Sequence, residues 1–171
     1  VPGDLVIVEE LTYFLIAEIF KDAHLTVVPC PMTSTGIDTD ALSVLINKQT
    51  PKLVYINPVH HNPLGTCLSS LDAHRLISLA DRHSFYILAD EPYVLLGFTS
   101  SHVSVSYYES KHVITCGTFS KLLAPGLRCG WIHADPELIE RISGEGALVS
   151  GGGPPSIICQ TIHNLLVSGN F

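Results

Sequence analysis

Three short segments of the chain carry polar side chains of the kinds that bind phosphate and form covalent bonds. They span residues 57–66, 90–93 and 117–128, and the side chains of interest are Asn62, Asp90, Tyr93, Thr118, Ser120, Lys121 and Arg128. An arginine with nearby hydroxyls can hold a phosphate through charge-assisted hydrogen bonds. The lysine is the side chain in this set that can form a Schiff base with an aldehyde.

A carboxylate completes this set. Asp90 follows a predicted strand, and a carboxylate at a strand end can keep a pyridine nitrogen protonated. A lysine Schiff base with an acidic partner for the pyridinium nitrogen is the signature of pyridoxal phosphate. The residue types therefore favour a pyridoxal phosphate site, provided that the three segments meet in space.

Alternating strands and helices must position these segments. Apolar runs predict strands at residues 5–8, 25–28, 53–56, 85–88, 112–115 and 129–133. Helices are expected over residues 13–22, 38–48, 69–84 and 156–168, with a further helix from residue 136. Near-continuous apolar strands separated by helices indicate an α/β fold with a mostly parallel sheet sandwiched by helices. Ligands bind beyond the carboxyl ends of such strands, and the three segments follow three of those ends.

Capping residues and helix or strand breakers mark the ends of several elements. Asp38 is expected to cap the second helix, and Ser69 with Asp72 resembles a capping box for the third. The second strand is expected to stop at Pro29. Residues 144–155 are rich in glycine and proline, which indicates a joint before the last helix.

Motifs in the same three segments resemble those of a known family. Residues 62–65 match the pattern N-P-x-G, residues 90–93 match D-x-x-Y, and residues 120–128 match S-K-x-x-x-x-G-x-R. Residues 10–13 resemble the segment E-P-x-Y, with Leu11 where proline is usual. The three main motifs occur in the family's order and cover most of the chain. The chain therefore resembles the large domain of the fold-type I, class I/II aminotransferases that depend on pyridoxal phosphate.

The resemblance implies a role for each matched residue. Lys121 would form a Schiff base with pyridoxal phosphate and then move a proton as general acid and base. Asp90 would pair with the pyridinium nitrogen, while Asn62 and Tyr93 would bind the phenolic oxygen of the ring. Phosphate would be held by Thr118, Ser120 and Arg128, and Tyr13 would stack on the ring. The implied activity is transfer of an amino group between an amino acid and a 2-oxo acid, by a protein that is usually a homodimer.

Alternatives stay open at the level of single residues. A purely structural role, in a turn, a loop or in packing, is open for Tyr13, Asn62, Asp90, Thr118 and Lys121. His60 and His61 are candidate metal ligands, but no third or fourth ligand follows at a recognisable spacing. Both histidines are therefore interpreted as loop residues beside the site.

Alternatives also stay open for the function. A lyase of the same fold is one, because residues 62–66, N-P-L-G-T, also resemble plant-type aminocyclopropane carboxylate synthases. A second is an aminotransferase-like domain that senses pyridoxal phosphate in a bacterial transcription regulator, whose DNA-binding module would precede residue 1. A third is an inert fragment.

Composition narrows the class and the compartment. The 171 residues are 46% apolar and carry a net charge of −7, which is typical of a folded core and gives no reason to expect nucleic acid binding through this domain. No apolar run is long enough to cross a bilayer, and no signal peptide is apparent. The five cysteines lack a C-x-x-C pair, so they are interpreted as reduced and mostly buried thiols in a cytoplasmic protein.

The length fits one domain, and the first residue is not methionine. Together with the resemblance, residues 1–171 are interpreted as a partial large domain without the family's N-terminal arm and C-terminal small domain. Those regions would supply further phosphate contacts and the arginine that binds the substrate carboxylate. We therefore expect the 171-residue chain alone to bind pyridoxal phosphate weakly and to turn over little.

Overall fold

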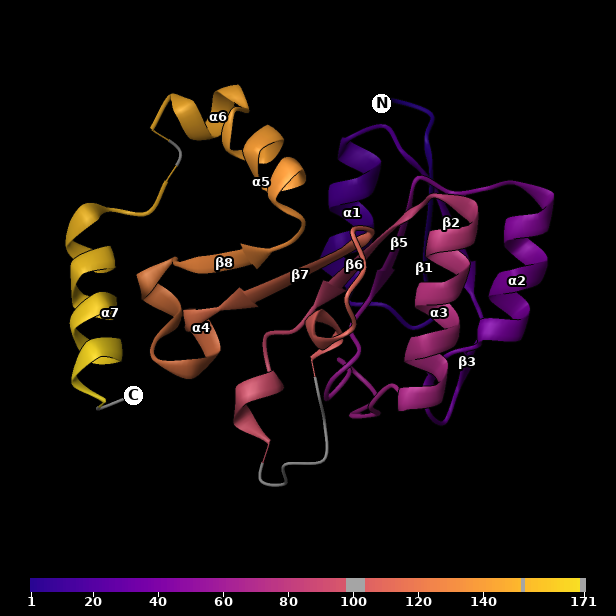
Figure 1. Ribbon diagram of the computed structural model, residues 1–171, viewed down its shortest axis with the longest axis horizontal. Helices are drawn as coiled ribbons and strands as arrows, with labels where there is room; N and C mark the ends of the chain where they lie inside the picture. The colour runs from indigo at the N-terminus through magenta and orange to yellow at the C-terminus, as the bar shows by residue number, and fades with distance from the viewer. Residues whose placement is uncertain (98–103, 152, 170–171) are drawn as a thin grey trace.

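Six strands form one sheet in the order β2-β1-β5-β6-β7-β8 (Figure 1). The computed structural model describes residues 1–97, 104–151 and 153–169. The strands are β1 (Leu5–Glu9), β2 (Thr26–Cys30), β5 (Leu53–Ile56), β6 (Tyr86–Asp90), β7 (Val113–Thr118) and β8 (Gly130–His133). Each strand overlaps one of the six predicted apolar runs.

The first five strands of this sheet are parallel, and β8 alone runs antiparallel, against β7. The predicted α/β fold with a mostly parallel sheet is therefore confirmed. Because β5, β6 and β7 are neighbours, their carboxyl ends lie side by side at one edge of the sheet. The three polar segments follow these ends, so the fold brings them together.

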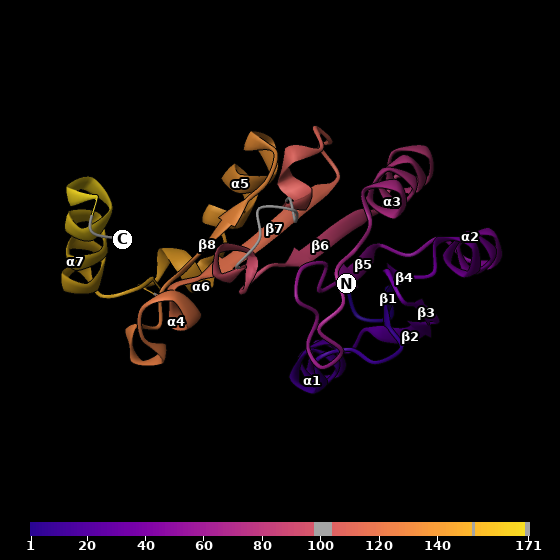
Figure 2. The same cartoon turned by 90° about the horizontal axis from the view of Figure 1, so that it is seen from below.

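Helices cover both faces of the sheet (Figure 2). Helix α1 (Phe14–Asp22) packs on one face, where Phe20 joins Val6, Val8 and Tyr55 in a buried cluster. Helices α2 (Thr39–Lys48) and α3 (Ser70–His83) cover the other face, which carries the larger cluster. The split follows from the strand period, because successive side chains point to opposite faces. Each large apolar side chain buried in this way contributes about 1.5–3 kcal/mol.

The larger cluster also explains why α2 and α3 lie where they do. Leu42 and Ile46 of α2, and Leu76 and Ala80 of α3, are each one helical turn apart and fully buried. This spacing of four residues places them on one stripe of each helix, and that stripe faces the sheet.

The predicted caps of these two helices are confirmed. Asp38 Oδ1 accepts hydrogen bonds from the backbone N–H groups of Asp40 and Ala41, each over 2.9 Å. Ser69 Oγ accepts one from the N–H of Asp72 over 3.1 Å. Each cap satisfies backbone donors that the first helical turn would leave unpaired.

The predicted end of β2 is wrong by two residues. The strand continues through Pro29 to Cys30, and Pro29 pairs in register with Val8 of β1. A proline lacks an N–H group and cannot donate a hydrogen bond to a neighbouring strand, so it is unusual in a strand that has a neighbour on each side. β2 tolerates it because β2 is an edge strand with β1 as its one neighbour in the sheet.

Several short elements have no clear signal in the sequence. They are the hairpin of β3 (Met32–Thr33) and β4 (Gly36–Ile37), the helices α4 (Phe119–Leu122) and α6 (Gly146–Val149), and the 3-10 turns η1 (Val94–Leu96), η2 (Val105–Tyr107) and η3 (Pro125–Leu127). α6 lies inside the predicted glycine- and proline-rich joint. Elements of two to four residues are too short for a hydrophobic period to develop, so pattern analysis does not detect them.

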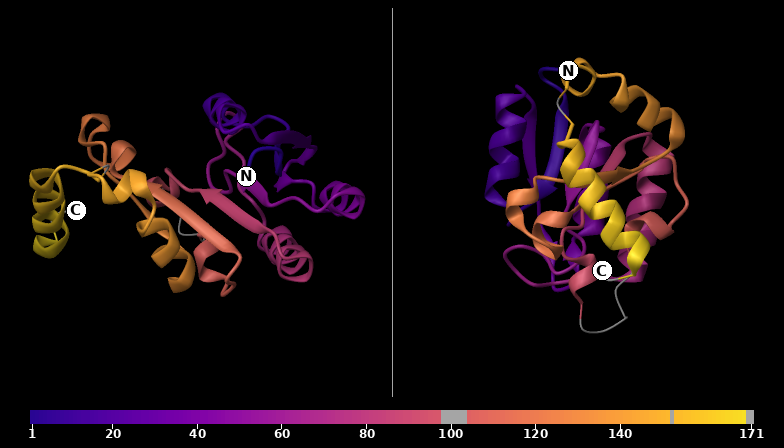
Figure 3. Two further views of the ribbon diagram at one scale, coloured as in Figure 1. Left: turned by 90° about the horizontal axis from the view of Figure 1, so that it is seen from above. Right: turned by 90° about the vertical axis from the view of Figure 1, so that its left-hand side faces the viewer.

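The C-terminal third of the chain is the least buried. Helix α5 (Pro136–Ser143) follows β8, and α7 (Ser156–Ser168) lies beyond the β8 edge of the sheet (Figure 3). Ile162 is the buried residue of α7, and all four residues of β8 are exposed. Among the described residues, no helix combines the length and apolar character that crossing a membrane requires.

The cysteines are free thiols, but the expectation that most of them are buried is wrong. Cys30 is buried, Cys159 is exposed, and the remaining three are half-buried. Burial, with the nearby Asp38 carboxylate, raises the pKa of Cys30 to about 12. Burial and Asp90 raise the pKa of Cys116 to about 11. Both thiols therefore stay protonated at neutral pH.

Candidate active site

A cavity of about 440 Å³ opens at the carboxyl ends of β5, β6 and β7. It is lined by Tyr13, Asn57, Asn62, Asp90, Pro92, Tyr93, Thr118, Ser120, Lys121, Pro125 and Arg128. All eight side chains predicted from the sequence are in this lining. Residues separated by more than a hundred positions in the chain therefore meet in one cavity.

Asp90 is the last residue of β6 and the carboxylate of the cavity. Tyr55, on neighbouring β5, donates a hydrogen bond from its hydroxyl to Asp90 Oδ2 over 2.8 Å. Within the described residues, Oδ1 has no hydrogen-bond partner, so this oxygen remains free to accept one from a ligand. Burial raises the pKa of Asp90, and the hydrogen bond from Tyr55 opposes that rise.

Tyr55 is itself almost completely buried beneath the cavity, with 1% of its surface exposed. Burial and the adjacent Asp90 carboxylate raise the pKa of its hydroxyl. Tyr55 therefore keeps its proton and acts as a hydrogen-bond donor. Its ring packs edge-on against Phe20 of α1, with ring centroids 6.0 Å apart, which fixes its position.

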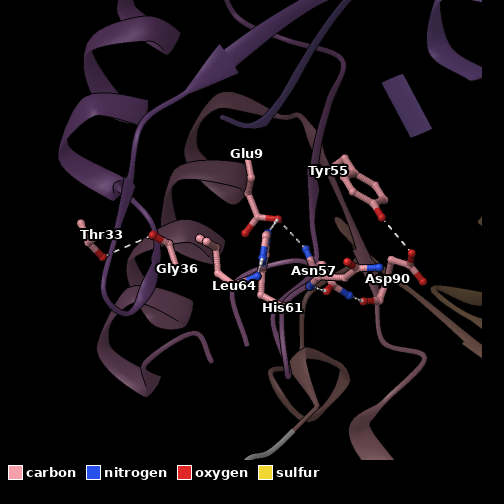
Figure 4. A network of polar contacts seen from close by, with 9 residues as sticks. Glu9, Thr33, Gly36, Tyr55, Asn57, His61, Leu64 and Asp90 are labelled. Carbon is pink, nitrogen blue, oxygen red and sulfur yellow. Dashed lines mark hydrogen bonds and ion pairs between the residues drawn. The ribbon is translucent and has the colours of Figure 1, made fainter. Parts of the chain in front are cut away.

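Asn57 links the strand ends below the cavity (Figure 4). Its Nδ2 group donates to the backbone carbonyl of Asp90 over 2.5 Å, and its Oδ1 accepts from the N–H of Asn62 over 2.7 Å. Its own N–H donates to Glu9 Oε2 over 2.8 Å. One buried amide thus connects β1, β6 and the loop that carries Asn62.

Thr118 ends β7 and begins α4. Its Oγ1 accepts a hydrogen bond from the N–H of Ser120 over 3.1 Å and donates one to the carbonyl of Cys129 over 3.3 Å. The hydroxyl therefore acts as a helix cap here. To bind a phosphate oxygen it would have to turn its proton away from Cys129.

Two cations from the connection between β7 and β8 also line the cavity. Lys121 lies in α4, and Arg128 follows η3 in the left-handed conformation, with φ of 50°. Both are exposed, and among the described residues neither forms an ion pair with a carboxylate. Arg128 Nη1 donates only a long hydrogen bond, 3.4 Å, to the carbonyl of Pro125. Their charges are therefore available to an anionic ligand.

Two tyrosines complete the lining. Tyr13 directly precedes α1 and is half-buried, with its ring 5.2 Å from that of Phe14 in an edge-to-face arrangement. Tyr93 directly precedes η1 and is also half-buried. Together they offer aromatic surface and phenol groups at the cavity wall.

Close packing at two glycines shapes the β7–β8 strand pair, whose connection carries the two cations. A Cβ atom on Gly117 would lie 2.1 Å from the indole of Trp131, and one on Gly130 would lie 2.6 Å from the backbone oxygen of Gly117. Glycine at both positions lets β7 and β8 pair up to Thr118, immediately before α4. The start of α4, and with it Lys121, depends on this tight pairing.

Comparison with known proteins assigns the family. Residues 1–156 match the family described as aminotransferase class I and II. The chain belongs to the class I and II aminotransferase family. The resemblance found in the sequence motifs is thereby confirmed.

Individual class I and II proteins are similar over most of the chain. Aromatic-amino-acid aminotransferase 1 of Thermococcus litoralis is 34% identical over 148 residues, which are 82% of this chain and 36% of that protein. An uncharacterized HTH-type transcriptional regulator of Escherichia coli, YjiR, is 31% identical over 134 residues, 77% of this chain and 28% of that protein.

A solved structure of the family is similar over nearly the whole chain. The α-aminoadipate aminotransferase LysN of Thermus thermophilus, complexed with N-(5'-phosphopyridoxyl)-L-leucine, has a TM-score of 0.89 and 25% identity. The match covers 98% of this chain and 44% of that one. The chain therefore spans between about a quarter and under half of the length of these class I and II relatives.

Asn57 and Tyr55 were not predicted from the sequence as site residues. Asn57 directly follows β5 at the sheet edge, which was a usable signal. Tyr55 lies two residues before Asn57, so both side chains point to the same face, because side chains alternate between the faces of a strand. His61 was interpreted as a loop residue beside the site, but its side chain is 1% exposed and lies against Glu9.

Proposed function

We propose that the chain forms the pyridoxal phosphate site of an aminotransferase, which moves an amino group between an amino acid and a 2-oxo acid. The observation that carries the proposal is the charge arrangement of the cavity. It combines a half-buried carboxylate, Asp90, with two cations that have no carboxylate partner among the described residues, Lys121 and Arg128. A ligand with an anionic group and a protonated ring nitrogen complements that arrangement.

The donors and acceptors of the cavity fit pyridoxal phosphate. Arg128 and Ser120 would hold the phosphate, with Thr118 as a third donor if its hydroxyl turns. The free Oδ1 of Asp90 would accept the hydrogen bond of the ring nitrogen. Asn62 and Tyr93 would donate to the phenolic oxygen, and Tyr13 would pack on the ring.

The chain's own residues would then divide the chemistry among them. When bound, pyridoxal phosphate supplies an aldehyde that takes up the amino group and a protonated ring that withdraws electrons from the reacting carbon. Lys121 supplies the amine that holds the aldehyde and an Nζ that can accept and return a proton. Tyr55 favours the ionised form of Asp90 by donating to Oδ2, and an ionised Asp90 would in turn keep a proton on the ring nitrogen.

We further propose that residues 1–171 are the cofactor-bearing part of a larger, dimeric protein. The coverage of the relatives supports this, because the chain matches 36% of the first and 44% of the solved structure. The family's substrate-binding and dimer contacts would then come from residues outside this chain. The five free thiols support a cytoplasmic location.

A second function has support from a specific observation. Helix-turn-helix regulators of Escherichia coli and Bacillus subtilis match 77% and 82% of the chain. The same site could therefore bind pyridoxal phosphate and an amino acid as signals. Multiple turnover separates the two functions, because an aminotransferase forms more keto acid product than there are sites. A lyase differs from both, because elimination releases ammonia whereas transamination conserves amino groups.

Replacement of the lysine tests the proposal. The full-length gene product is mixed with pyridoxal phosphate, reduced with borohydride and digested, and mass spectrometry is used to find the modified peptide. We expect the mass increase on Lys121 and its loss, with the visible absorbance and turnover, in Lys121→Ala. Lys111→Ala, an exposed lysine outside the cavity, is the matched control and should behave as the unmodified protein. A Lys121→Ala protein that stays active and coloured would contradict the assignment.

A further inference from the structure

Glu9 and His61 form a buried pair that the proposed chemistry does not use. Glu9 ends β1, and His61 lies in the loop after β5. Their side chains are 2% and 1% exposed, and His61 Nε2 lies 3.2 Å from Glu9 Oε2 (Figure 4). Ionisable groups are rarely buried this completely unless they are paired. Core packing alone therefore does not explain why these two residues are buried here.

The hydrogen bonds around His61 assign its proton. The backbone N–H of Leu64 donates to His61 Nδ1 over 3.3 Å, so Nδ1 acts as the acceptor of the ring. The neutral imidazole must then carry its proton on Nε2, the atom that faces Glu9. The Nε2 contact to Glu9 is close in distance but not aligned as a hydrogen bond. The ring thus bridges the carboxylate and the loop backbone.

The pair is connected to three residues of the cavity. Glu9 Oε2 also accepts the N–H of Asn57, whose side chain binds the backbone of Asn62 and of Asp90. His61 is the neighbour of Asn62, and its own carbonyl accepts the N–H of Gly65 over 2.6 Å. The backbone of Asn62 is therefore held from two directions, by Asn57 and by the loop that His61 stabilises.

We propose that Glu9 and His61 are positioning residues, which fix the Asn62 side chain at the edge of the cavity through Asn57 and the loop of residues 61–65. The role of Asn62 toward a phenolic oxygen rests on the proposed function, but its placement does not. Buried hydrogen bonds such as those from Asn57 to Glu9 and from Leu64 to His61 restrict the backbone to one arrangement more strictly than apolar packing does. A side chain that must meet a ligand atom within a fraction of an ångström benefits from such a support.

Two substitutions of His61 separate its two contacts. His61→Asn keeps an acceptor near the Nδ1 position for Leu64 but cannot reach Glu9. His61→Gln keeps a donor near the Nε2 position for Glu9 but leaves the N–H of Leu64 unpaired. Glu9→Gln keeps an oxygen for the N–H of Asn57 and removes the charge. His74→Asn, which replaces an exposed histidine on α3, is the matched control.

The first measurement uses the chain without cofactor. Amide hydrogen exchange, read at Asn57 and Asn62, reports how firmly the network holds each backbone N–H. We expect about tenfold faster exchange at Asn62 in His61→Asn and in Glu9→Gln, and no change in His74→Asn. Unchanged exchange at Asn62 in all of the His61 and Glu9 variants would overturn the proposal, whether or not the protein binds pyridoxal phosphate.

The second measurement follows the visible absorbance of bound pyridoxal phosphate against pH. A donor to the phenolic oxygen stabilises its negative charge, so loss of that donor should move the pH midpoint upward, by about one unit in Asn62→Ala. His61→Asn and Glu9→Gln should shift it in the same direction by less. In an Asn62→Ala background, His61→Asn should shift the midpoint no further, because it acts through Asn62.

The outcomes distinguish this proposal from the proposed function. If the unmodified protein binds no pyridoxal phosphate, the proposed function fails, and the exchange measurement still decides the role of the pair. If the unmodified protein binds it and His61→Asn shifts the midpoint equally with and without Asn62, the pair acts on the site by another route and positioning through Asn62 is wrong.

Discussion

The hydroxyl of Tyr55 and Oδ2 of Asp90 lie 2.8 Å apart, joined by a hydrogen bond between neighbouring strands. The two side chains have opposite effects on each other. The carboxylate makes the tyrosine harder to ionise, and the tyrosine makes the carboxylate easier to ionise, against the effect of burial. The tyrosine therefore offsets part of the cost of charge on this half-buried carboxylate and leaves its other oxygen available to a ligand.

Removal of the tyrosine hydroxyl should raise the pKa of Asp90 further. In Tyr55→Phe, burial is no longer opposed, so a smaller fraction of Asp90 is ionised near neutral pH. We expect the acidic limb of the pH–rate profile to move to higher pH and kcat near neutrality to fall about tenfold, the equivalent of one hydrogen bond to a charged group. Tyr86→Phe, at the far end of β6, is the control. An unmoved acidic limb in Tyr55→Phe would refute the coupling.

Asp90 should also lower the stability of the cofactor-free protein. Its pKa is raised above 3.8 by burial, so the folded chain binds this proton more tightly than the unfolded chain does. The contribution of Asp90 to stability is therefore greatest below that value and is lost as pH rises through the folded pKa. Asp90→Asn cannot ionise and should unfold at a higher temperature than the unmodified protein at neutral pH. Thermal unfolding across pH measures the difference, which should shrink as the pH approaches 3.8.

The same substitution should weaken the cofactor site, so stability and function would change in opposite directions. Glu18→Gln, at an exposed position on α1, is the control. It should not raise the unfolding temperature at neutral pH in the way expected for Asp90→Asn. A lower unfolding temperature for Asp90→Asn at neutral pH would mean that the carboxylate stabilises the fold, contrary to the effect expected from burial.

Sequence patterns predicted most of the fold because most of its elements are long enough to show a period. The six strands of the main sheet and the helices α2, α3 and α7 each have an apolar run or stripe, or a cap such as Asp38. The β3–β4 hairpin and α4 have two to four residues per element, which is too short to show an apolar run or stripe. The antiparallel direction of β8 against β7 was not predicted from the sequence.

The candidate site was predictable where a side chain has an unusual type at a strand end. Asp90 ends β6, Lys121 lies in α4 directly after β7, and both line the cavity. Glu9 and Tyr55 were not predicted, and neither was the buried contact of His61 with Glu9, because these contacts join residues 35 to 52 positions apart. Such contacts depend on strand order, and strand order is a tertiary property. Thr118 was left open between a phosphate ligand and a loop residue, and in the structure its hydroxyl caps α4.

Arg128 should distinguish a phosphorylated from an unphosphorylated ligand. Its guanidinium has no carboxylate partner among the described residues, so its charge is available to a phosphate. Arg128→Gln should weaken binding of pyridoxal phosphate about 10- to 100-fold, the range for hydrogen bonds to charged groups, and leave binding of pyridoxal almost unchanged. Fluorescence titration with both ligands measures this. Arg75→Gln, exposed on α3, is the control.

Equal losses for the two ligands would show that Arg128 shapes the backbone instead of binding phosphate. Arg128 has φ of 50°, which glycine adopts without strain. Arg128→Gly therefore relieves any backbone cost and should still bind pyridoxal phosphate as poorly as Arg128→Gln.

The two glycines of the β7–β8 pair should respond differently to a methyl group. In Gly117→Ala the new Cβ would meet the indole of Trp131, a side chain that is 37% exposed and can swing outward. In Gly130→Ala it would meet the backbone oxygen of Gly117, which cannot move without breaking the strand pairing. We expect Gly130→Ala to cost about 1–3 kcal/mol of stability, as overpacking does, and Gly117→Ala less.

Trp131 is the single tryptophan of the chain, so its fluorescence reports the displacement directly. Gly117→Ala should shift the emission toward that of a solvent-exposed indole, and adding Trp131→Ala should restore stability because it removes the clashing ring. The same second substitution should not restore Gly130→Ala. Because β7 leads directly into Thr118 and Lys121, Gly130→Ala should also weaken pyridoxal phosphate binding. A Gly130→Ala protein as stable as the unmodified one would show that the pairing before α4 is looser than the structure indicates.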